Sequence, residues 1–158
     1  MKYILILFFS LLFISCNSKD KRPLIGKTVY QQKLNSVFKD ASKSPLKSKD
    51  LKTFKGLDFY PIDSSYIITA SIEKTPDSPF LAMPTNTDET SGGDSYGGGR
   101  YMDVFKSSIN TNGTVELNFN NTYNPYCAYN VDYSCPLTPR NNHLNMEILA
   151  GVKDFKKQ

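Results

Sequence analysis

The sequence is poor in the residues on which metal centres and disulfide-rich folds depend. It contains one histidine and three cysteines in 158 residues. A single histidine excludes a multi-histidine metal centre, and three cysteines are too few for a small disulfide scaffold. No stretch reaches 18 consecutive apolar residues, so we predict no membrane-spanning helix. Because a Ser-His-Asp signature and multi-ligand metal spacing are also missing, we assign no catalytic residue, no metal site and no cofactor.

The first sixteen residues indicate export. Lys2 precedes a nearly unbroken apolar run from Tyr3 to Ile14, which is too short to span a bilayer but typical of the core of a secretory signal. The run ends at Ser15-Cys16, and this resembles a bacterial lipoprotein signal, where cleavage precedes a cysteine that receives lipid. We therefore expect an exported protein of the bacterial cell envelope, anchored to a membrane by acyl chains such as palmitate on Cys16. An ordinary signal peptide, or a short buried helix that ends in cysteine, is the alternative.

Charge is distributed unevenly along the chain. The overall net charge is +4, but residues 17–55 carry +8 and residues 56–150 carry −7. Because the basic stretch follows the expected anchor, either attraction to anionic lipid headgroups or a solvated tether explains it. We expect no nucleic-acid partner, since export would separate the protein from nucleic acid.

The chain divides into five expected segments. These are a lipoprotein signal peptide (1–15), a tether (16–28), an amphipathic helix (29–43), a β-rich domain (44–152) and a basic tail (153–158). Thr28 is a plausible N-cap of the helix. A helical stripe of apolar residues predicts the face that docks on the domain, and it consists of Tyr30, Leu34, Val37, Phe38 and Ala41. The polar stretch 42–55 is expected to be loop.

Alternating apolar residues predict strands in the remainder. Residues 66–72 form one such strand, and 144–150 form the last. Asn112-Gly113 is a strong turn signal, which predicts a hairpin between 101–108 and 114–119. We therefore expect a mainly β fold, an antiparallel sheet arranged as a small sandwich or incomplete barrel, with one N-terminal amphipathic helix.

Two cysteines remain once Cys16 carries lipid. In an oxidising compartment the pair Cys127 and Cys135 suggests a disulfide that closes a short loop. Two alternatives use His143, either as a further ligand of a half zinc site or as the base for a nucleophilic cysteine. The spacing is a poor match to a zinc site.

Two motifs supply the candidate binding residues. The first, DETSGGDSYGGGR, covers residues 88–100 and resembles a P-loop only in its glycine content, because it lacks Gly-Lys-Ser/Thr. The second covers residues 119–139 and is rich in tyrosine and asparagine, a combination that suits glycan or peptide binding. The predicted binding residues are Asp88, Asp94, Arg100, Tyr101, Asn120 and Asn124. The alternative is structural, with the aspartates capping turns, Arg100 pairing with one of them, and the second motif forming a pinned loop.

These motifs also carry a family resemblance. The run from Asp88 to Tyr101, followed by NPYCAY, SCPL and a closing Ala-Gly, resembles an uncharacterised prokaryotic family, domain-of-unknown-function family 1684. The resemblance covers about residues 44–151 and implies no established activity. Family members carry several tens of further residues where Thr87 here meets Asp88, so the resemblance predicts an internal deletion. Lost strands would leave sheet edges unpaired and apolar faces exposed, which predicts marginal stability, dimerisation by edge pairing, or aggregation.

Function is expected to be binding rather than catalysis. The sequence favours an envelope lipoprotein that binds a small polar ligand, a glycan or a protein partner. One alternative is a hydrolytic enzyme with its site on the Asp88–Arg100 loop, and another is a family remnant without function.

Overall fold

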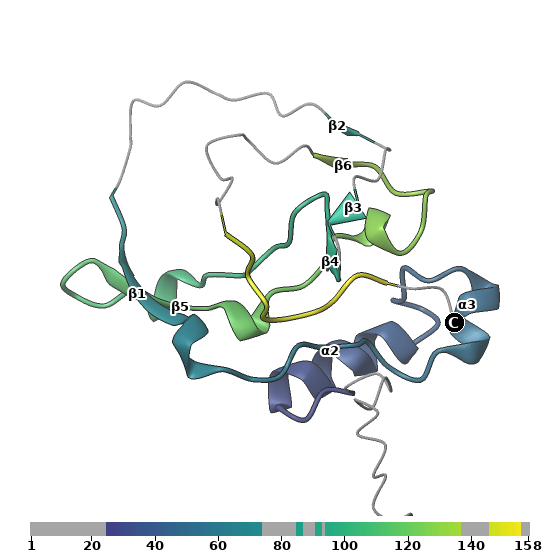
Figure 1. The fold of residues 1–158 in the computed structure, drawn as a ribbon, viewed down its shortest axis with the longest axis horizontal. Helices are drawn as coiled ribbons and strands as arrows, with labels where there is room; N and C mark the ends of the chain where they lie inside the picture. The colour runs from purple at the N-terminus through teal and green to yellow at the C-terminus, as the bar shows by residue number, and fades with distance from the viewer. Residues whose placement is uncertain (1–24, 74–84, 87–90, 93, 137–145, 156–158) are drawn as a thin grey trace, which may run out of the picture.

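A computed structural model of the chain describes residues 25–73, 85–86, 91–92, 94–136 and 146–155 (Figure 1). The signal segment with Cys16, the candidate residue Asp88, and His143 lie outside these ranges. Among the described residues we find no helix with the length and apolar character needed to cross a membrane.

The N-terminal helix forms where the sequence predicts it. Helix α2 covers Val29–Lys39, and Thr28 is its N-cap. The Thr28 hydroxyl accepts a hydrogen bond from the Gln31 backbone N–H, and the Gln31 side chain accepts one from the Thr28 N–H, which completes a capping box. Lys39 in the last turn complements the helix dipole. These local interactions explain why the helix starts at this point.

The buried face of α2 is rotated from the predicted stripe. Its buried residues are Gln31, Asn35 and Phe38. Asn35 is buried because its side-chain oxygen accepts a hydrogen bond from the Leu57 N–H at 2.8 Å, a contact that hydrophobic spacing cannot reveal. Ala41, the last residue of the predicted stripe, is exposed. The stripe therefore covers the core only in part.

The stretch 42–55 is not all loop. Residues Ser48–Thr53 form a short helix, α3, and Pro45 and Leu46 before it are buried. The loop prediction was wrong here because six residues are too few for a helical period to be recognised.

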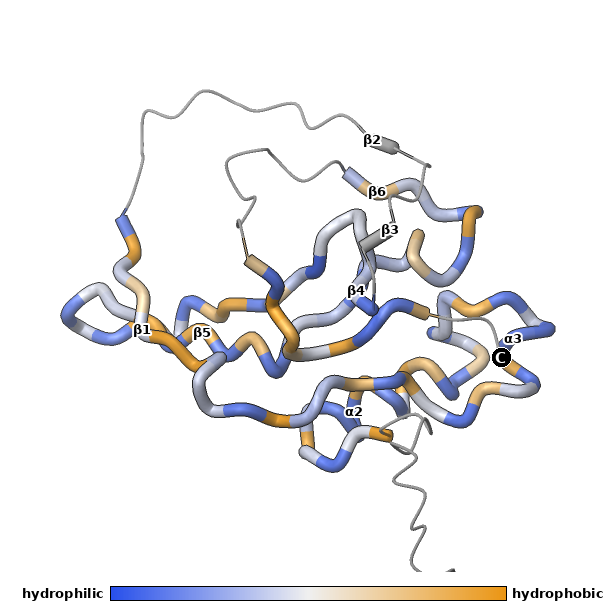
Figure 2. Tube along the Cα trace, viewed as in Figure 1, coloured by the Kyte–Doolittle hydropathy of each residue, from blue (hydrophilic) through white to orange (hydrophobic). Residues whose placement is uncertain are grey.

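Antiparallel pairing confirms the mainly β prediction. In the described residues it is distributed over three two-stranded sheets (Figure 1). Strand β1 (Ile67–Ser71) pairs with β5 (Thr114–Asn118). The sequence predicted a strand at each of these places but not their pairing. Two shorter pairs join β2 (Thr85–Asn86) to β6 (Cys135–Pro136), and β3 (Ser91–Gly92) to β4 (Ser95–Tyr96). Figure 2 shows an apolar stretch along β1, where Ile67 and Ile68 are exposed.

The predicted hairpin between 101–108 and 114–119 was wrong, because the second strand pairs with a different segment. A turn does form at Asn112-Gly113, where the Asn110 N–H donates to the Thr114 carbonyl at 2.8 Å. However, β5 pairs with β1, and Lys106–Ser108 forms a 3-10 turn instead of a strand. The partner choice has a physical reason, because pairing with β1 gives five matched residues and buries Val115 to 2% exposure.

The predicted last strand, 144–150, does not form over its described part, residues 146–150. Met146 and Leu149, which the alternation assigns to different faces, are both exposed. Pairing begins later, at a bridge between Val152 and Phe59. Backbone hydrogen bonds from this region to two separate segments replace a regular ladder: Tyr60 N–H donates to the Gly151 carbonyl at 2.9 Å.

The C-terminal segment, residues 146–155, passes through the centre of the molecule (Figure 1, yellow). On one side it bonds to residues 58–60, and on the other the Val152 N–H donates to the Thr122 carbonyl at 3.0 Å. Val152 belongs to the main core cluster, together with Phe38, Leu46, Leu57, Phe59, Ala128 and Tyr129. This segment therefore joins the helix, the 57–60 stretch and the tyrosine-rich loop.

Candidate functional site

Arg100, the last residue of the glycine-rich motif, forms hydrogen bonds with the C-terminal segment. Its guanidinium donates to the Ile148 carbonyl at 2.6 Å, to the Ala150 carbonyl, and at 3.5 Å to the Val152 carbonyl. The side chain is half-buried, and burial lowers the pKa of the guanidinium. These bonds direct both terminal nitrogens of the guanidinium to backbone carbonyls, so in this structure Arg100 stabilises the chain itself.

Of the two candidate aspartates, the structure describes Asp94. Asp94 is exposed, and its backbone carbonyl accepts a hydrogen bond from the Asp154 N–H at 2.9 Å. Asp88 lies outside the described residues. Within the described ranges, no group of three or more His, Cys, Asp or Glu side chains is placed to hold a metal ion. The hydrolytic alternative on this loop therefore stays a prediction.

The candidate asparagines and Tyr101 are also bonded to backbone. The Asn120 amide, 2% exposed, accepts from the Asp63 N–H at 3.0 Å and donates to the Asp63 carbonyl at 2.8 Å. Asn124 donates to the Lys153 carbonyl at 2.8 Å. Tyr101 exchanges two backbone hydrogen bonds with Tyr123. Most of the predicted binding set therefore holds segments of the protein together.

The two remaining cysteines are joined. Cys127 and Cys135 form a disulfide with their Cα atoms 6.0 Å apart. The bond closes the loop that carries Tyr129 and Tyr133, and Tyr126 directly precedes it. Tyr129 packs edge-on against Phe38 of α2, with ring centroids 4.6 Å apart. The disulfide thus lies next to the contact between this loop and the helix.

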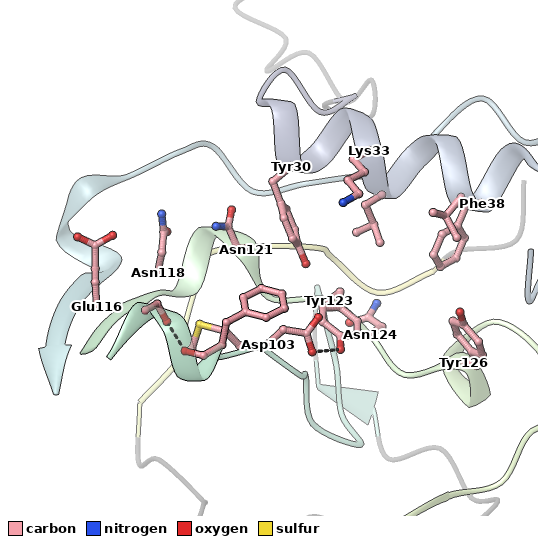
Figure 3. A pocket seen from close by; sticks show the side chains of 15 residues that line it. Tyr30, Lys33, Phe38, Asp103, Glu116, Asn118, Asn121, Tyr123, Asn124 and Tyr126 are labelled. Atoms are coloured by element: carbon pink, nitrogen blue, oxygen red, sulfur yellow. Dashed lines mark hydrogen bonds between the residues drawn. The ribbon is translucent and has the colours of Figure 1, made fainter. Parts of the chain in front are cut away.

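A cavity of about 570 Å³ lies between α2 and the segments that face it (Figure 3). Such a volume is within the range of small-molecule pockets. The cavity is lined by residues of α2, of the 102–108 stretch, of β5 and of the 118–126 stretch: Tyr30, Lys33, Leu34, Val37, Phe38, Met102, Asp103, Phe105, Ser108, Glu116, Asn118, Asn121, Tyr123, Asn124 and Tyr126. Apolar side chains of the predicted helix stripe thus form a cavity wall.

A carboxylate and two phenols meet inside this cavity. The Tyr123 hydroxyl donates to Asp103 Oδ1 at 2.9 Å, and Tyr30 extends from α2 toward the same pair (Figure 3). Burial, and to a lesser extent the Asp103 charge, raises the pKa of Tyr30 to about 12. Burial also raises the pKa of Tyr123, assisted by its hydrogen bond to Asp103. Both phenols therefore stay protonated at neutral pH and act as neutral hydrogen-bonding groups.

The cavity wall also contains a buried acceptor without a partner. Asn124 is 1% exposed, and its Oδ1 makes no hydrogen bond to any described residue. Leaving a buried amide oxygen unpaired costs about 1–3 kcal/mol. The Tyr129 hydroxyl, which is also buried without a hydrogen bond among the described residues, lies beside the Asn124 side chain. Asn124 therefore belongs to the interior behind the cavity wall rather than to the surface that a ligand would touch.

Sequence reasoning identified one side of this site and missed the other. The ring-and-amide loop supplies Tyr123, Asn124 and Tyr126, as its composition suggested. Lys33 on the helix and Asp103 were not among the predicted binding residues. The half-buried stripe on α2 was the available signal, since a helix that faces a cavity has the same period as one that faces a core.

Comparison with known proteins places part of this architecture in a family. Residues 85–153 match the model of the family described as "Protein of unknown function (DUF1684)". The match covers 69 of the 158 residues and identifies residues 85–153 as a DUF1684 region. The DUF1684 region contains Arg100, Asn124 and the C-terminal segment, whereas the α2 wall of the cavity precedes it. The family prediction is confirmed, and the internal deletion between Thr87 and Asp88 stays a prediction. No curated protein matches the chain.

Proposed function

We propose that this protein is a lipid-anchored protein of the bacterial envelope whose folded part binds a small polar ligand in the cavity beside α2. The exported location is supported by the signal-like segment that ends at Cys16. The dimer through exposed strand edges is a second, separate proposal, and the apolar residues exposed on β1 support it.

The observation that carries the binding function is the cavity itself, whose lining contains the exposed carboxylates of Asp103 and Glu116. Groups that are exposed to the cavity can bond to a ligand without first breaking contacts within the fold. The same cavity contains Asp103 and half-buried rings, which suits ligand binding better than packing.

A cavity-filling variant tests this function. Val37 lines the cavity, so Val37→Trp would occupy part of its volume, whereas Lys39→Trp places the same ring on the exposed surface of the same helix. Thermal unfolding is measured with and without each member of a panel of neutral, cationic and anionic small molecules. A ligand should raise the melting temperature of the wild type and of Lys39→Trp, but not that of Val37→Trp. Equal responses in all three proteins would contradict a site in the cavity.

Anchoring is tested separately. Cells that express the protein are labelled with palmitate, and the wild type should incorporate the label while Cys16→Ser should not. Cys127→Ser is the matched control, because it removes a cysteine outside the signal segment. Labelling of Cys16→Ser equal to that of the wild type would contradict the lipid anchor.

A further inference from the structure

We infer that the ligand of the α2 cavity is a neutral saccharide, whose ring packs on tyrosine and whose hydroxyls donate hydrogen bonds to the acceptors of the cavity wall. This inference rests on the proposed binding function and specifies its ligand class. It follows from three properties of the lining: the presence of both acceptors and donors, the mixture of charges, and the exposed ring surfaces.

The lining offers both acceptors and donors. The exposed carboxylates of Asp103 and Glu116 are acceptors. Asp103 receives a hydrogen bond from Tyr123, and a carboxylate can accept several. The Lys33 ammonium and the Asn121 amide are donors. A sugar hydroxyl both donates and accepts, so a saccharide can bond to both kinds of group.

The lining disfavours a ligand that carries only one kind of polar group. Its charged side chains are Asp103, Glu116 and Lys33. A phosphate or carboxylate ligand would face two carboxylates with one lysine to offset them. An ammonium ligand would bring donors alone and would leave the Lys33 and Asn121 donors without an acceptor. A neutral, hydroxyl-rich molecule can bond both to the carboxylates and to these donors.

Ring surfaces are exposed at the same cavity. Tyr126 is 44% exposed and lies at one end of the view in Figure 3, and Phe105 is 68% exposed. The Tyr126 ring is held by an edge-on contact with Tyr133, at 5.3 Å between centroids. A fixed ring can pack against the apolar C–H face of a sugar while the sugar hydroxyls reach polar neighbours. The cavity volume of about 570 Å³ allows one or two sugar rings.

The Tyr126–Tyr133 pair provides a matched test. Either Tyr126→Ala or Tyr133→Ala removes the ring contact, but only Tyr126 lines the cavity. The full chain is purified in a polyoxyethylene detergent, which carries neither sugar nor charge. Binding of glucose, N-acetylglucosamine and cellobiose is measured by calorimetry, alongside tetramethylammonium chloride, inorganic phosphate and trialanine. We expect one or more saccharides to bind, about three- to tenfold more weakly to Tyr126→Ala, and to Tyr133→Ala within about twofold of the wild type.

A second pair of variants guards against misfolding of the tyrosine variants. Glu116 is exposed on β5 and lines the cavity, whereas Glu147 is exposed outside it. Glu116→Gln should weaken saccharide binding about threefold or more, and Glu147→Gln should leave it unchanged. If the ammonium, phosphate or peptide probe binds in a Val37→Trp-sensitive manner and no saccharide does, the saccharide inference is overturned while the binding function stands. If no probe binds, both are overturned.

Discussion

The polar side chains around the C-terminal segment differ from those around the α2 cavity in how fully their hydrogen bonds are used. Arg100 donates to carbonyls of that segment, and Asn120 pairs both ends of its amide with Asp63. Beside the cavity, Asn124 Oδ1 is buried without a partner among the described residues. Glu116 is exposed there, although it also lines the cavity.

This difference separates structural from binding roles within one set of motifs. A side chain whose hydrogen bonds are satisfied by backbone stabilises the fold, because removing it leaves buried partners unpaired. A side chain with unused capacity beside a cavity contributes little to folding and is available to a ligand. Asn124 belongs to the first group, since its Nδ2 holds Lys153 and its oxygen has almost no accessible surface. The exposed carboxylates of Asp103 and Glu116 belong to the second group. Substitutions in the two regions distinguish side chains that stabilise the fold from side chains that are available to a ligand.

Replacement of Arg100 should have the largest effect on stability. Arg100→Ala leaves the carbonyls of Ile148 and Ala150 without their charged donor, and we expect a loss of about 4 kcal/mol in the free energy of unfolding. Urea denaturation measures it. Arg100→Lys should recover only part, because one ammonium cannot span both carbonyls. If Arg100→Ala is as stable as the wild type but no longer binds an anion, Arg100 serves ligand binding and not the stability of the fold.

A side chain at Gly151 should also disrupt the centre of the molecule. Gly151 has φ +77°, and an added Cβ would overlap the Thr122 hydroxyl and carbonyl oxygens. We expect Gly151→Ala to cost about 3 kcal/mol, through both backbone strain and overlap. Gly113 is the matched control, with φ +76° and its nearest neighbour, the Ile72 carbonyl oxygen, 3.9 Å from the added Cβ. Gly113→Ala should cost only about 1 kcal/mol. Equal losses in thermal melts would show that overlap at Gly151 is relieved.

Loss of the disulfide should have an intermediate effect. Opening the loop closed by Cys127 and Cys135 should cost about 2.5 kcal/mol in the chain-entropy model. A reductant should therefore lower the melting temperature of the wild type. The double variant Cys127→Ser/Cys135→Ser should melt at the lower temperature and ignore the reductant. If the reductant leaves the wild type unchanged while mass spectrometry shows that the bond is broken, the loop is held by its rings alone.

The smallest effect concerns Tyr30 in alkaline solution. Its pKa is raised to about 12 in the folded protein, from about 10 in the unfolded chain. The unfolded state therefore loses its proton first, so this contribution to stability is complete below pH 10 and is lost as the pH rises through 12. Because Tyr30 is only half-buried, we expect the effect to be about 1 kcal/mol. Tyr30→Phe should lose less stability than the wild type between pH 10 and 12 in denaturation titrations. Parallel curves would contradict a shielded Tyr30.

Local features of this fold could be read from the sequence. Thr28 and Gln31 form the capping box of α2 from residues three apart, and alternation identified strands at 67–71 and 114–118. The spacing of Cys127 and Cys135 likewise suggested the bond that the structure contains. Such features depend on neighbours within one turn, one strand or one short loop, so the sequence contains nearly all their determinants.

The tertiary structure alone decided which distant segments meet. Strand β5 pairs with β1 rather than with 101–108, because the longer register with β1 buries Val115. Arg100 faces carbonyls 48 or more positions away, and Asn35 is buried by a contact with Leu57. The scarcity of histidine and cysteine limited the chemistry from the start, but the cavity exists only because a half-buried helix stripe lies opposite the tyrosine- and asparagine-rich loop. Long-range partners are selected by burial and hydrogen-bond satisfaction over the whole fold, and no local pattern encodes that choice.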